Sequence, residues 1–387
     1  MQLNQKSHPE PILRPKSPCF GAGPTNKYPG WSVSSLSSAL VGRSHRSAEG
    51  ISQIRRIIDL TRDVLNVPDN YHIALIPGSA TGAVESALWN LLGPRGVDVF
   101  AWDVFSRLWV TDVVEQLKIQ DQRIFEEEGG VLPDLQQYSP SRDVVFTWNG
   151  TTAGASIPND DWIPDDRKGL SICDATSSAF MFPVRNWSKI DAYGFSWQKG
   201  LGGEGAHGML ILSPRAIDRL LTYTPSWPIP RLLRLTKNHR LIDGLFNEGK
   251  IINTPSMLAI QDVINALEWA QSVGGQEGLW NKCQENFALM KAWVDAHSEL
   301  DFLVKDPETI SPVSVCLTLK GPLDQAVRRI KFVVDELARL GVAYEIKNHY
   351  LAPVSFRIWC GPTVDSEDLR RLLPWIDWAL SKSLAVG

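Results

Sequence analysis

Three stretches of the 387-residue chain combine residue types that could do chemistry. The first, Ile76-Pro-Gly-Ser-Ala-Thr-Gly-Ala-Val-Glu85, reads as a small-residue turn between a strand and a helix. A helix N-terminus presents unpaired N–H groups and the positive end of a dipole, and glycines let an anion approach them. The turn therefore predicts a phosphate cradle. An ordinary tight turn is the alternative, because neither GxGxxG nor a Walker lysine pattern is present.

An acid and a lysine follow two further apolar runs. Asp174 ends the run Gly169-Leu-Ser-Ile-Cys-Asp, and Lys199 follows Tyr193-Gly-Phe-Ser-Trp-Gln. Ligands of open α/β sheets lie outside the carboxyl ends of the strands, so we expect both side chains at one sheet edge. A lone loop lysine is usually surface decoration. Here the order of phosphate-type turn, strand-end acid and strand-end lysine argues for a site.

Pyridoxal phosphate requires this combination of groups. Its aldehyde needs a lysine amine for a Schiff base, its pyridinium nitrogen needs a carboxylate, and its phosphate needs N–H donors. The turn at residues 78–82, Asp174 and Lys199 supply one group of each kind. The sequence therefore predicts a pyridoxal 5'-phosphate site.

Short β-rich runs that alternate with helical patterns must position these groups. Such alternation is typical of βαβ units and a mostly parallel sheet, so we expect an α/β fold with a seven-stranded sheet. Helical spacing is found in Thr81–Leu92 and Arg107–Leu117. The expected strands are His72–Ile76, Val97–Trp102, Arg123–Phe125, Asp143–Thr147, Leu170–Cys173, Ile190–Phe195 and Met209–Leu212.

A different pattern follows the proline-rich connector Tyr223–Arg231. It predicts helix from Met257 to about His297 and then a smaller α+β region. That region holds strands at Pro312–Leu319 and Val354–Cys360 and helices at Pro322–Leu340 and Ser366–Leu380. We expect an N-terminal tail (1–17), a large cofactor-binding domain (18–265) and a small C-terminal domain (266–387).

Composition excludes several classes of protein. The chain is 43% hydrophobic and 21% charged, which excludes wholesale disorder, and its net charge of -4 gives no reason to expect a nucleic-acid partner. No apolar run is long enough for a membrane span, and the polar N-terminus lacks a secretory signal, so a cytoplasmic location is expected. The five scattered cysteines contain no CxxC pair and are expected to be reduced core residues. No metal site is predicted.

Four motifs resemble those of a known family. Gly42-Arg-Ser-His-Arg-Ser47, Asp174-Ala-Thr-Ser177, Phe195-Ser-Trp-Gln-Lys199 and Gly202-Gly-Glu-Gly-Ala-His-Gly208 resemble the phosphoserine aminotransferases, class V enzymes of fold-type I that use pyridoxal phosphate. The resemblance runs from about Pro18 to Leu380. It implies a fold-type I aminotransferase and a homodimer with shared active sites.

The resemblance also implies cofactor-binding residues. Lys199 would form the Schiff base and move the proton between the substrate Cα and the cofactor, while Asp174 would pair with the pyridine nitrogen. An aromatic ring, Phe105, would cover the cofactor, with Trp109 a weaker candidate, and Thr151 would contact the ring hydroxyl. The phosphate would be held by Ser79, Ala80, Thr81 and Gln198, with Asn253 and Thr254 reaching it from the neighbouring subunit.

Substrate-binding residues follow from the same resemblance. Arg357 would grip the α-carboxylate, because a planar guanidinium suits a carboxylate. His45 and Arg46 would meet the substrate phosphate or the glutamate side chain, and His349 lies near a substrate histidine of the family. The implied reaction converts 3-phosphohydroxypyruvate and L-glutamate to O-phospho-L-serine and 2-oxoglutarate, in serine biosynthesis.

Two other functions stay open at this stage. The turn Gly78-Ser-Ala-Thr-Gly82 lacks an arginine that several family members use for the substrate phosphate. One alternative is therefore a related fold-type I transaminase or lyase acting on a different amino acid in specialised metabolism. The other is a cofactor-binding protein without turnover. Lys199 and Asp174 argue against the second alternative, because simple binding requires neither a proton shuttle nor an electron sink.

Overall fold

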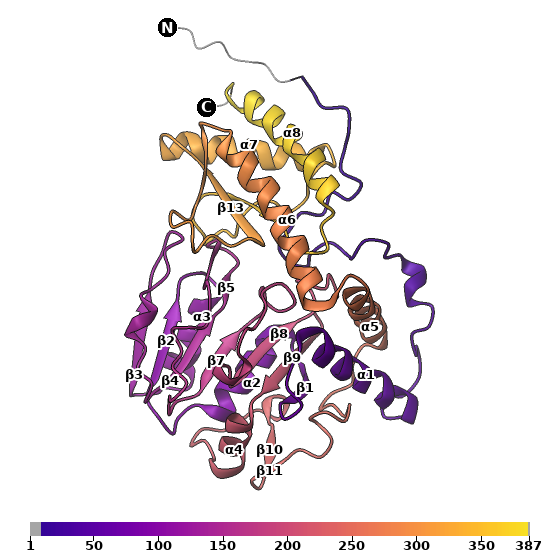
Figure 1. Cartoon of the computed structure of the whole chain (residues 1–387), viewed down its shortest axis with the longest axis vertical. Helices are drawn as coiled ribbons and strands as arrows, with labels where there is room; N and C mark the ends of the chain where they lie inside the picture. The colour runs from indigo at the N-terminus through magenta and orange to yellow at the C-terminus, as the bar shows by residue number, and fades with distance from the viewer. Residues whose placement is uncertain (1–8, 386–387) are drawn as a thin grey trace.

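A seven-stranded sheet forms the centre of the computed structural model, which describes residues 9–385 (Figure 1). The strand order is β1-β9-β8-β7-β4-β2-β3. Only β9 runs antiparallel to its neighbours, so the expected mostly parallel seven-stranded sheet is confirmed. Its strands are β1 (His72–Pro77), β2 (Val97–Ala101), β3 (Gln122–Glu126), β4 (Asp143–Thr147), β7 (Ser171–Asp174), β8 (Ala192–Ser196) and β9 (His207–Leu212).

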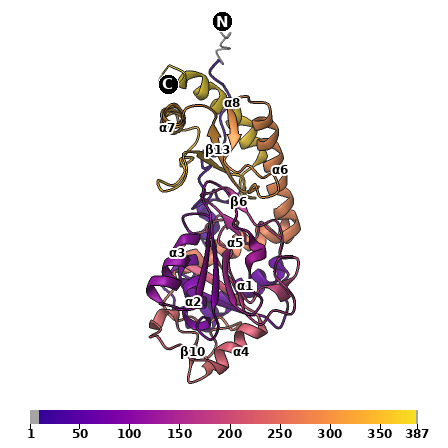
Figure 2. The same cartoon turned by 90° about the vertical axis from the view of Figure 1, so that its left-hand side faces the viewer.

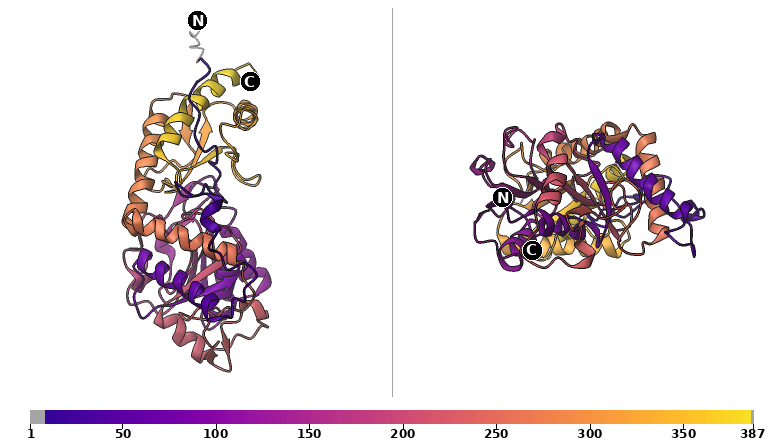
Figure 3. Two further views of the ribbon diagram at one scale, coloured as in Figure 1. Left: turned by 90° about the vertical axis from the view of Figure 1, so that its right-hand side faces the viewer. Right: turned by 90° about the horizontal axis from the view of Figure 1, so that it is seen from below.

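Helices cover both faces of this sheet. Alternate side chains of a strand point to opposite faces, so Ile73 of β1 packs in the cluster that contains Ile54 of α1, whereas Ile76 packs in the cluster that contains Leu88 of α2. Figure 3 shows α1 and α5 side by side on one face. The helices of this part of the chain are α1 (Ala48–Leu65), α2 (Ser79–Leu91), α3 (Ser106–Thr111), α4 (Pro214–Thr222) and α5 (Met257–Ser272).

The expected helix at Arg107–Leu117 differs from the structure. The α-helix α3 ends at Thr111, and a π-helical turn follows from Asp112 to Gln116. Single π-turns are rare and are frequently found at functional sites.

The C-terminal part of the chain forms a second, smaller layer above the large sheet (Figures 1 and 2). An antiparallel sheet of β12 (Leu300–Phe302), β13 (Ser314–Leu319) and β14 (Phe356–Trp359) packs with three helices. These helices are α6 (Gly275–Asp295), α7 (Leu323–Arg339) and α8 (Ser366–Ser383). The fold class is thus confirmed as α/β with a smaller α+β part.

Two short pairs of strands and one N-terminal segment complete the fold. β5 (Asn149–Gly150) pairs with β6 (Ala155–Ser156), and β10 (Thr236–Lys237) pairs with β11 (Arg240–Leu241). The N-terminal segment contacts both layers: the Tyr344 N–H donates to the Pro18 carbonyl (2.7 Å), and the Thr25 N–H donates to the Gln198 carbonyl (3.0 Å). The segment from Pro18 to Thr25 therefore connects the two layers beside the predicted site.

The domain boundaries and the cysteines bear on two further expectations. The domain boundaries remain a prediction: the division at residue 265 falls within α5, and the first eight residues of the tail lie outside the described residues. The expectation that all five cysteines are core residues is wrong for Cys19, which is exposed, whereas the other four are buried. No described helix is both long enough and apolar enough to cross a membrane.

Candidate active site

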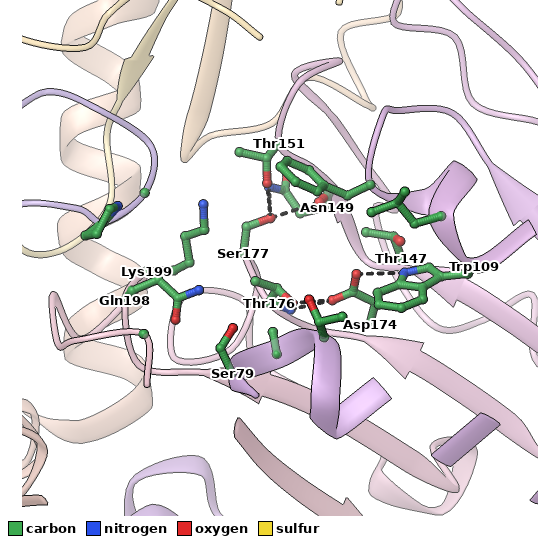
Figure 4. A pocket seen from close by; sticks show the side chains of 17 residues that line it. Ser79, Trp109, Thr147, Asn149, Thr151, Asp174, Thr176, Ser177, Gln198 and Lys199 are labelled. Carbon is green, nitrogen blue, oxygen red and sulfur yellow. Dashed lines mark hydrogen bonds between the residues drawn. The ribbon is translucent and has the colours of Figure 1, made fainter. Parts of the chain in front are cut away.

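A cavity of about 320 Å³ lies at the carboxyl ends of the central strands, where β4, β7 and β8 meet the N-terminus of α2 (Figure 4). Eight of the residues expected to contact the cofactor line it together. They are Ser79, Ala80, Thr81, Phe105, Thr151, Asp174, Gln198 and Lys199.

The turn after β1 brings the α2 N-terminus to this cavity. Gly78, with φ of 86°, directly precedes the helix. The first turn of α2 also contacts the backbone so closely that Gly82 and Gly208 have no room for a side chain. A Cβ on Gly82 would lie 1.9 Å from the Pro77 carbonyl oxygen, and a Cβ on Gly208 would lie 2.1 Å from the Ser79 carbonyl oxygen. The glycines therefore let the helix begin at the cavity wall, with its free N–H groups at the wall.

Asp174 ends β7 in the middle of the sheet, paired with Thr147 of β4 and Gly194 of β8. The residue is 3% exposed, and burial raises the pKa of its carboxyl group. Oδ1 accepts hydrogen bonds from the Thr176 N–H (2.9 Å) and hydroxyl, and Oδ2 accepts one from the Trp109 indole N–H (2.9 Å). These neutral donors favour the ionised form and partly oppose the effect of burial.

Lys199 lies in the turn after β8 and reaches the cavity from the opposite side (Figure 4). Its Nζ donates to the Ala22 carbonyl, and the Trp359 ring centroid lies 6.0 Å from Nζ. Burial, and secondarily the Arg357 charge, lower the pKa of Lys199 to about 7. The amine is therefore partly neutral near pH 7 and can act as nucleophile or proton carrier.

A hydroxyl cluster forms the wall near Thr151. The Thr151 hydroxyl donates to Ser177 Oγ (2.7 Å), and the Asn149 side-chain amide donates to the same oxygen (2.9 Å). Phe105 is 38% exposed at the mouth, with its ring centroid 6.1 Å from that of His349. Polar side chains and one aromatic ring thus border the space between Asp174 and Lys199.

Arg357 comes from the small sheet, on β14. Its Nη1 lies 3.5 Å from the Thr151 carbonyl oxygen, and its buried Nε has no hydrogen-bond partner among residues 9–385. Burial lowers the pKa of this guanidinium, and no carboxylate of the described chain forms an ion pair with it. A half-buried cation with an unused donor is suited to bind an anionic substrate group.

Six expected residues do not line this cavity within one chain: Arg357 and His349, which lie near its Thr151 and Phe105 walls, and four residues that lie elsewhere. His45 is buried in the turn before α1, where burial and the neighbouring Arg46 lower its pKa, and Arg46 is exposed. Asn253 and Thr254 lie before α5, and the Asn253 amide donates to the Thr254 carbonyl (3.3 Å).

Sequence reasoning missed several residues of the cavity wall. Thr176 and Ser177 belong to the motif Asp174–Ser177, and Asn149 lies two residues before Thr151, so closeness in the sequence to Asp174 and Thr151 was the available signal. Gly23 and Pro24 lie 175 residues or more before Lys199 and carry no local signal. Leu108, Thr147 and Gly205 were missed as well, whereas Trp109, the weaker candidate for covering the cofactor, does line the cavity.

The cavity fits pyridoxal phosphate. It holds an amine of lowered pKa, a buried carboxylate without a basic partner among the described residues, and a helix N-terminus with the Gln198 amide beside it (Figure 4). Gln198 Oε1 is buried and makes no hydrogen bond within residues 9–385. Within the same residues, no group of three or more His, Cys, Asp or Glu side chains is arranged to hold a metal ion.

Comparisons with known proteins agree with this reading. No protein-family model matches the chain. The chain is 48% identical over 370 residues to the phosphoserine aminotransferase of Methanosarcina mazei, covering 96% of this chain and 98% of that protein; the Methanosarcina barkeri enzyme gives the same values.

Solved structures show the same fold. Phosphoserine aminotransferase from Cytophaga hutchinsonii superposes with a TM-score of 0.76 at 20% identity, covering 92% of this chain and 97% of that one. The alanine–glyoxylate aminotransferase of Nostoc gives 0.77 at 19% identity, covering 99% of both chains. A pyridoxal phosphate-bound phosphoserine aminotransferase from Trichomonas vaginalis gives 0.74 at 17% identity, covering 94% of this chain and 100% of that one.

Fold and site together define a fold-type I aminotransferase that uses pyridoxal phosphate. At 48% identity over nearly the whole length, the chain belongs to the phosphoserine aminotransferase family.

Proposed function

We propose that this chain converts 3-phosphohydroxypyruvate and L-glutamate to O-phospho-L-serine and 2-oxoglutarate, the transamination step of serine biosynthesis. The observation that carries the proposal is the single cavity shared by Lys199, Asp174 and the α2 N-terminus. An amine, a carboxylate and an N–H cradle are the three groups that a pyridoxal phosphate transaminase requires.

When bound, pyridoxal phosphate supplies an aldehyde that takes up amino groups and a ring that withdraws electrons. The residues of the chain then have separate tasks. The α2 N-terminus and Gln198 hold the phosphate, Asp174 holds the protonated ring nitrogen, and Lys199 carries a proton to and from the substrate Cα. The pKa of about 7 allows Lys199 to accept and release that proton near neutral pH.

The substrate is held by polar and cationic side chains from two places in the fold. Arg357 binds the α-carboxylate, which both amino-acid substrates share, through the donors that it leaves unused in the described chain. His45 and Arg46 bind the phosphate of phosphoserine or the side-chain carboxylate of glutamate. His349, whose ring contacts that of Phe105, is a further candidate for binding substrate.

The active enzyme is a homodimer in this proposal, with each site completed by the second subunit. The support is that His45, Arg46, Asn253 and Thr254 do not line their own chain's cavity. Large apolar side chains are exposed on the same segments: Val41 is 67% exposed near His45, and Leu258 is 47% exposed near Thr254. A second copy would cover them. We further propose a cytoplasmic location.

Purified protein assayed with a panel of amino donors tests the reaction. Phosphoserine and glutamate should be the preferred donors, followed through the change in cofactor absorbance. The Lys199→Ala variant should keep its fold and lose transamination, because Lys199 lines a cavity and carries the proton. Turnover of an unphosphorylated donor well above that of phosphoserine would overturn the substrate assignment, and an active Lys199→Ala enzyme would overturn the mechanism.

A further inference from the structure

The Asp174 carboxylate is held on three sides by neutral donors. A carboxylate has about four lone-pair positions. Both positions on Oδ1 are taken by the Thr176 N–H and hydroxyl, and one on Oδ2 by the Trp109 indole N–H at 2.9 Å. One position on Oδ2 remains, and Asp174 lines the cavity. The side chain therefore has one acceptor left for a ligand.

Trp109 is built into its place as a hydrogen-bond donor. It is 4% exposed on α3, one turn before the π-helical turn Asp112–Gln116, and it lies 65 residues from Asp174 in the chain. The tryptophan packs in the cluster of α2 and the central strands. Figure 4 shows the indole beside Asp174, with its N–H directed at the carboxylate.

No basic side chain of residues 9–385 forms an ion pair with Asp174, and the nearby Asp103 disfavours its charge. A buried carboxylate without a cation tends to take up a proton. Loss of one neutral donor would move it further toward the protonated form, which cannot pair with a protonated ring nitrogen. The Trp109 hydrogen bond therefore affects both the direction and the charge of Asp174.

We propose that Trp109 is a positioning residue: its indole N–H orients the Asp174 carboxylate and keeps it ionised, so that the remaining Oδ2 position meets the protonated ring nitrogen of the cofactor. The inference rests on the proposed cofactor site. It separates Trp109 from a role in covering the ring, because a stacking residue acts through its aromatic face and this one acts through its N–H.

Pyridoxamine 5'-phosphate is the probe for the test, because it carries the ring and phosphate but cannot form a Schiff base with Lys199. Its dissociation constant is measured by equilibrium dialysis on cofactor-free protein. Trp109→Phe keeps an aromatic ring and removes the donor, and it should weaken binding by about tenfold to a hundredfold, as expected for a hydrogen bond to a charged group. Trp109→Met, which also lacks a donor, replaces it if the first variant does not fold.

The chain offers a matched control. The Trp293 indole N–H donates to Asp377 Oδ1 at 2.9 Å, the same type of bond, in the C-terminal layer away from the cavity. Trp293→Phe should leave the affinity for pyridoxamine 5'-phosphate within about twofold of the wild type. Equal weakening by the two variants would show a general loss of packing and would overturn the proposal.

A double-mutant cycle separates positioning from packing. In an Asp174→Asn background the carboxylate is absent, so the added effect of Trp109→Phe should fall to about twofold or less. The same full loss in both backgrounds would contradict the proposal. If Asp174→Asn weakens binding and Trp109→Phe does not, only the role of Trp109 fails. If wild-type protein does not bind the probe, or Asp174→Asn binds it equally well, the cofactor site itself fails.

A spectroscopic measurement adds a readout that a packing role would not move. In protein loaded with pyridoxal phosphate, a positive ring nitrogen disfavours a second positive charge on the nearby Schiff-base nitrogen. Less ring protonation in Trp109→Phe should therefore shift the pH midpoint of the visible absorbance band upward, and Trp293→Phe should not shift it. An unchanged midpoint in Trp109→Phe would contradict the proposal.

Discussion

Lys199 and Gly23 lie so close that a Cβ on Gly23 would be 2.3 Å from Lys199 Nζ. In the same segment, the Ala22 carbonyl accepts a hydrogen bond from Lys199 Nζ, and the Thr25 hydroxyl donates one to the Lys199 carbonyl (2.6 Å). The lysine is thus fixed at both its backbone and its amine by an N-terminal segment about 175 residues away. A bare Cα at position 23 is the condition for this contact.

Gly23→Ala should therefore displace the Lys199 amine and weaken pyridoxal phosphate binding by about tenfold or more, as overpacking of a filled site does. The measurement is the dissociation constant of pyridoxal phosphate. Gly30→Ala is the control: Gly30 also has a positive φ, 90°, but a Cβ there would meet nothing within 4 Å. The prediction is contradicted if both variants weaken binding equally, since backbone strain alone would then be sufficient.

The lowered pKa of Lys199 predicts a pH dependence of stability in cofactor-free protein. The pKa falls from 10.5 to about 7 on folding, so between these values the unfolded chain binds more protons than the folded one. The free energy of unfolding contributed by this group therefore rises with pH across that window and levels off above it.

Lys199→Met removes this titration and keeps a long side chain. The difference in melting temperature, wild type minus Lys199→Met, should rise between about pH 7 and pH 10, with an energy on the order of a few kcal/mol. A difference that stays constant across this range would show that the folded-state pKa of Lys199 is not depressed.

Much of the large sheet could be predicted because buried parallel strands are short apolar runs that end in polar residues. Leu170–Cys173, for instance, is the expected form of β7, Ser171–Asp174. Helix α1 was not predicted, although Ser47 caps it and Ile54, Ile57 and Ile58 form its buried stripe. The capping serine and the helical spacing of the isoleucines are therefore the sequence features that indicate this helix.

The contacts that tune the site could not be predicted, because they depend on tertiary geometry. The Trp109 hydrogen bond to Asp174 requires a particular rotation of α3, which the π-helical turn accompanies. The Lys199 contact with Ala22 joins segments 177 residues apart. Residue type and spacing gave the groups of the site, and only packing shows which partner each group meets.

The proposed sharing of active sites between two subunits predicts complementation between two inactive variants. Lys199→Ala removes the amine from the site of the protomer that carries the mutation. Asn253→Ala/Thr254→Ala instead removes the contacts that the mutated protomer would give to its partner's site. In the mixed dimer one protomer carries Lys199→Ala and the other carries the Asn253/Thr254 changes. Both defects then affect the same site, and the second site has no mutation.

Mixing the two proteins should therefore restore up to about half of the activity per mixed dimer, by counting one intact site of two. The activity of the mixture is measured after subunit exchange has been verified, with each variant alone as the control. Exchange without recovery of activity would contradict sharing of the phosphate contacts across the interface.

Arg46 and Arg357 should affect different sets of substrates. Arg357 is half-buried, and its Nε makes no hydrogen bond within residues 9–385. It is assigned to the α-carboxylate, so Arg357→Ala should lower kcat/KM for every amino donor. Arg46 is exposed in its own chain and is assigned to the distal anionic group, so Arg46→Ala should lower kcat/KM about tenfold to a hundredfold for phosphoserine and glutamate.

Alanine, which has the α-carboxylate but no distal anion, distinguishes the two roles. Its low turnover should fall further in Arg357→Ala and should stay unchanged in Arg46→Ala, because Arg46 has no group to bind on this donor. The measurement is kcat/KM for phosphoserine, glutamate and alanine in each variant. Loss of alanine turnover in Arg46→Ala would instead place Arg46 in the general structure of the site, and the choice of a phosphorylated substrate would then need another cation.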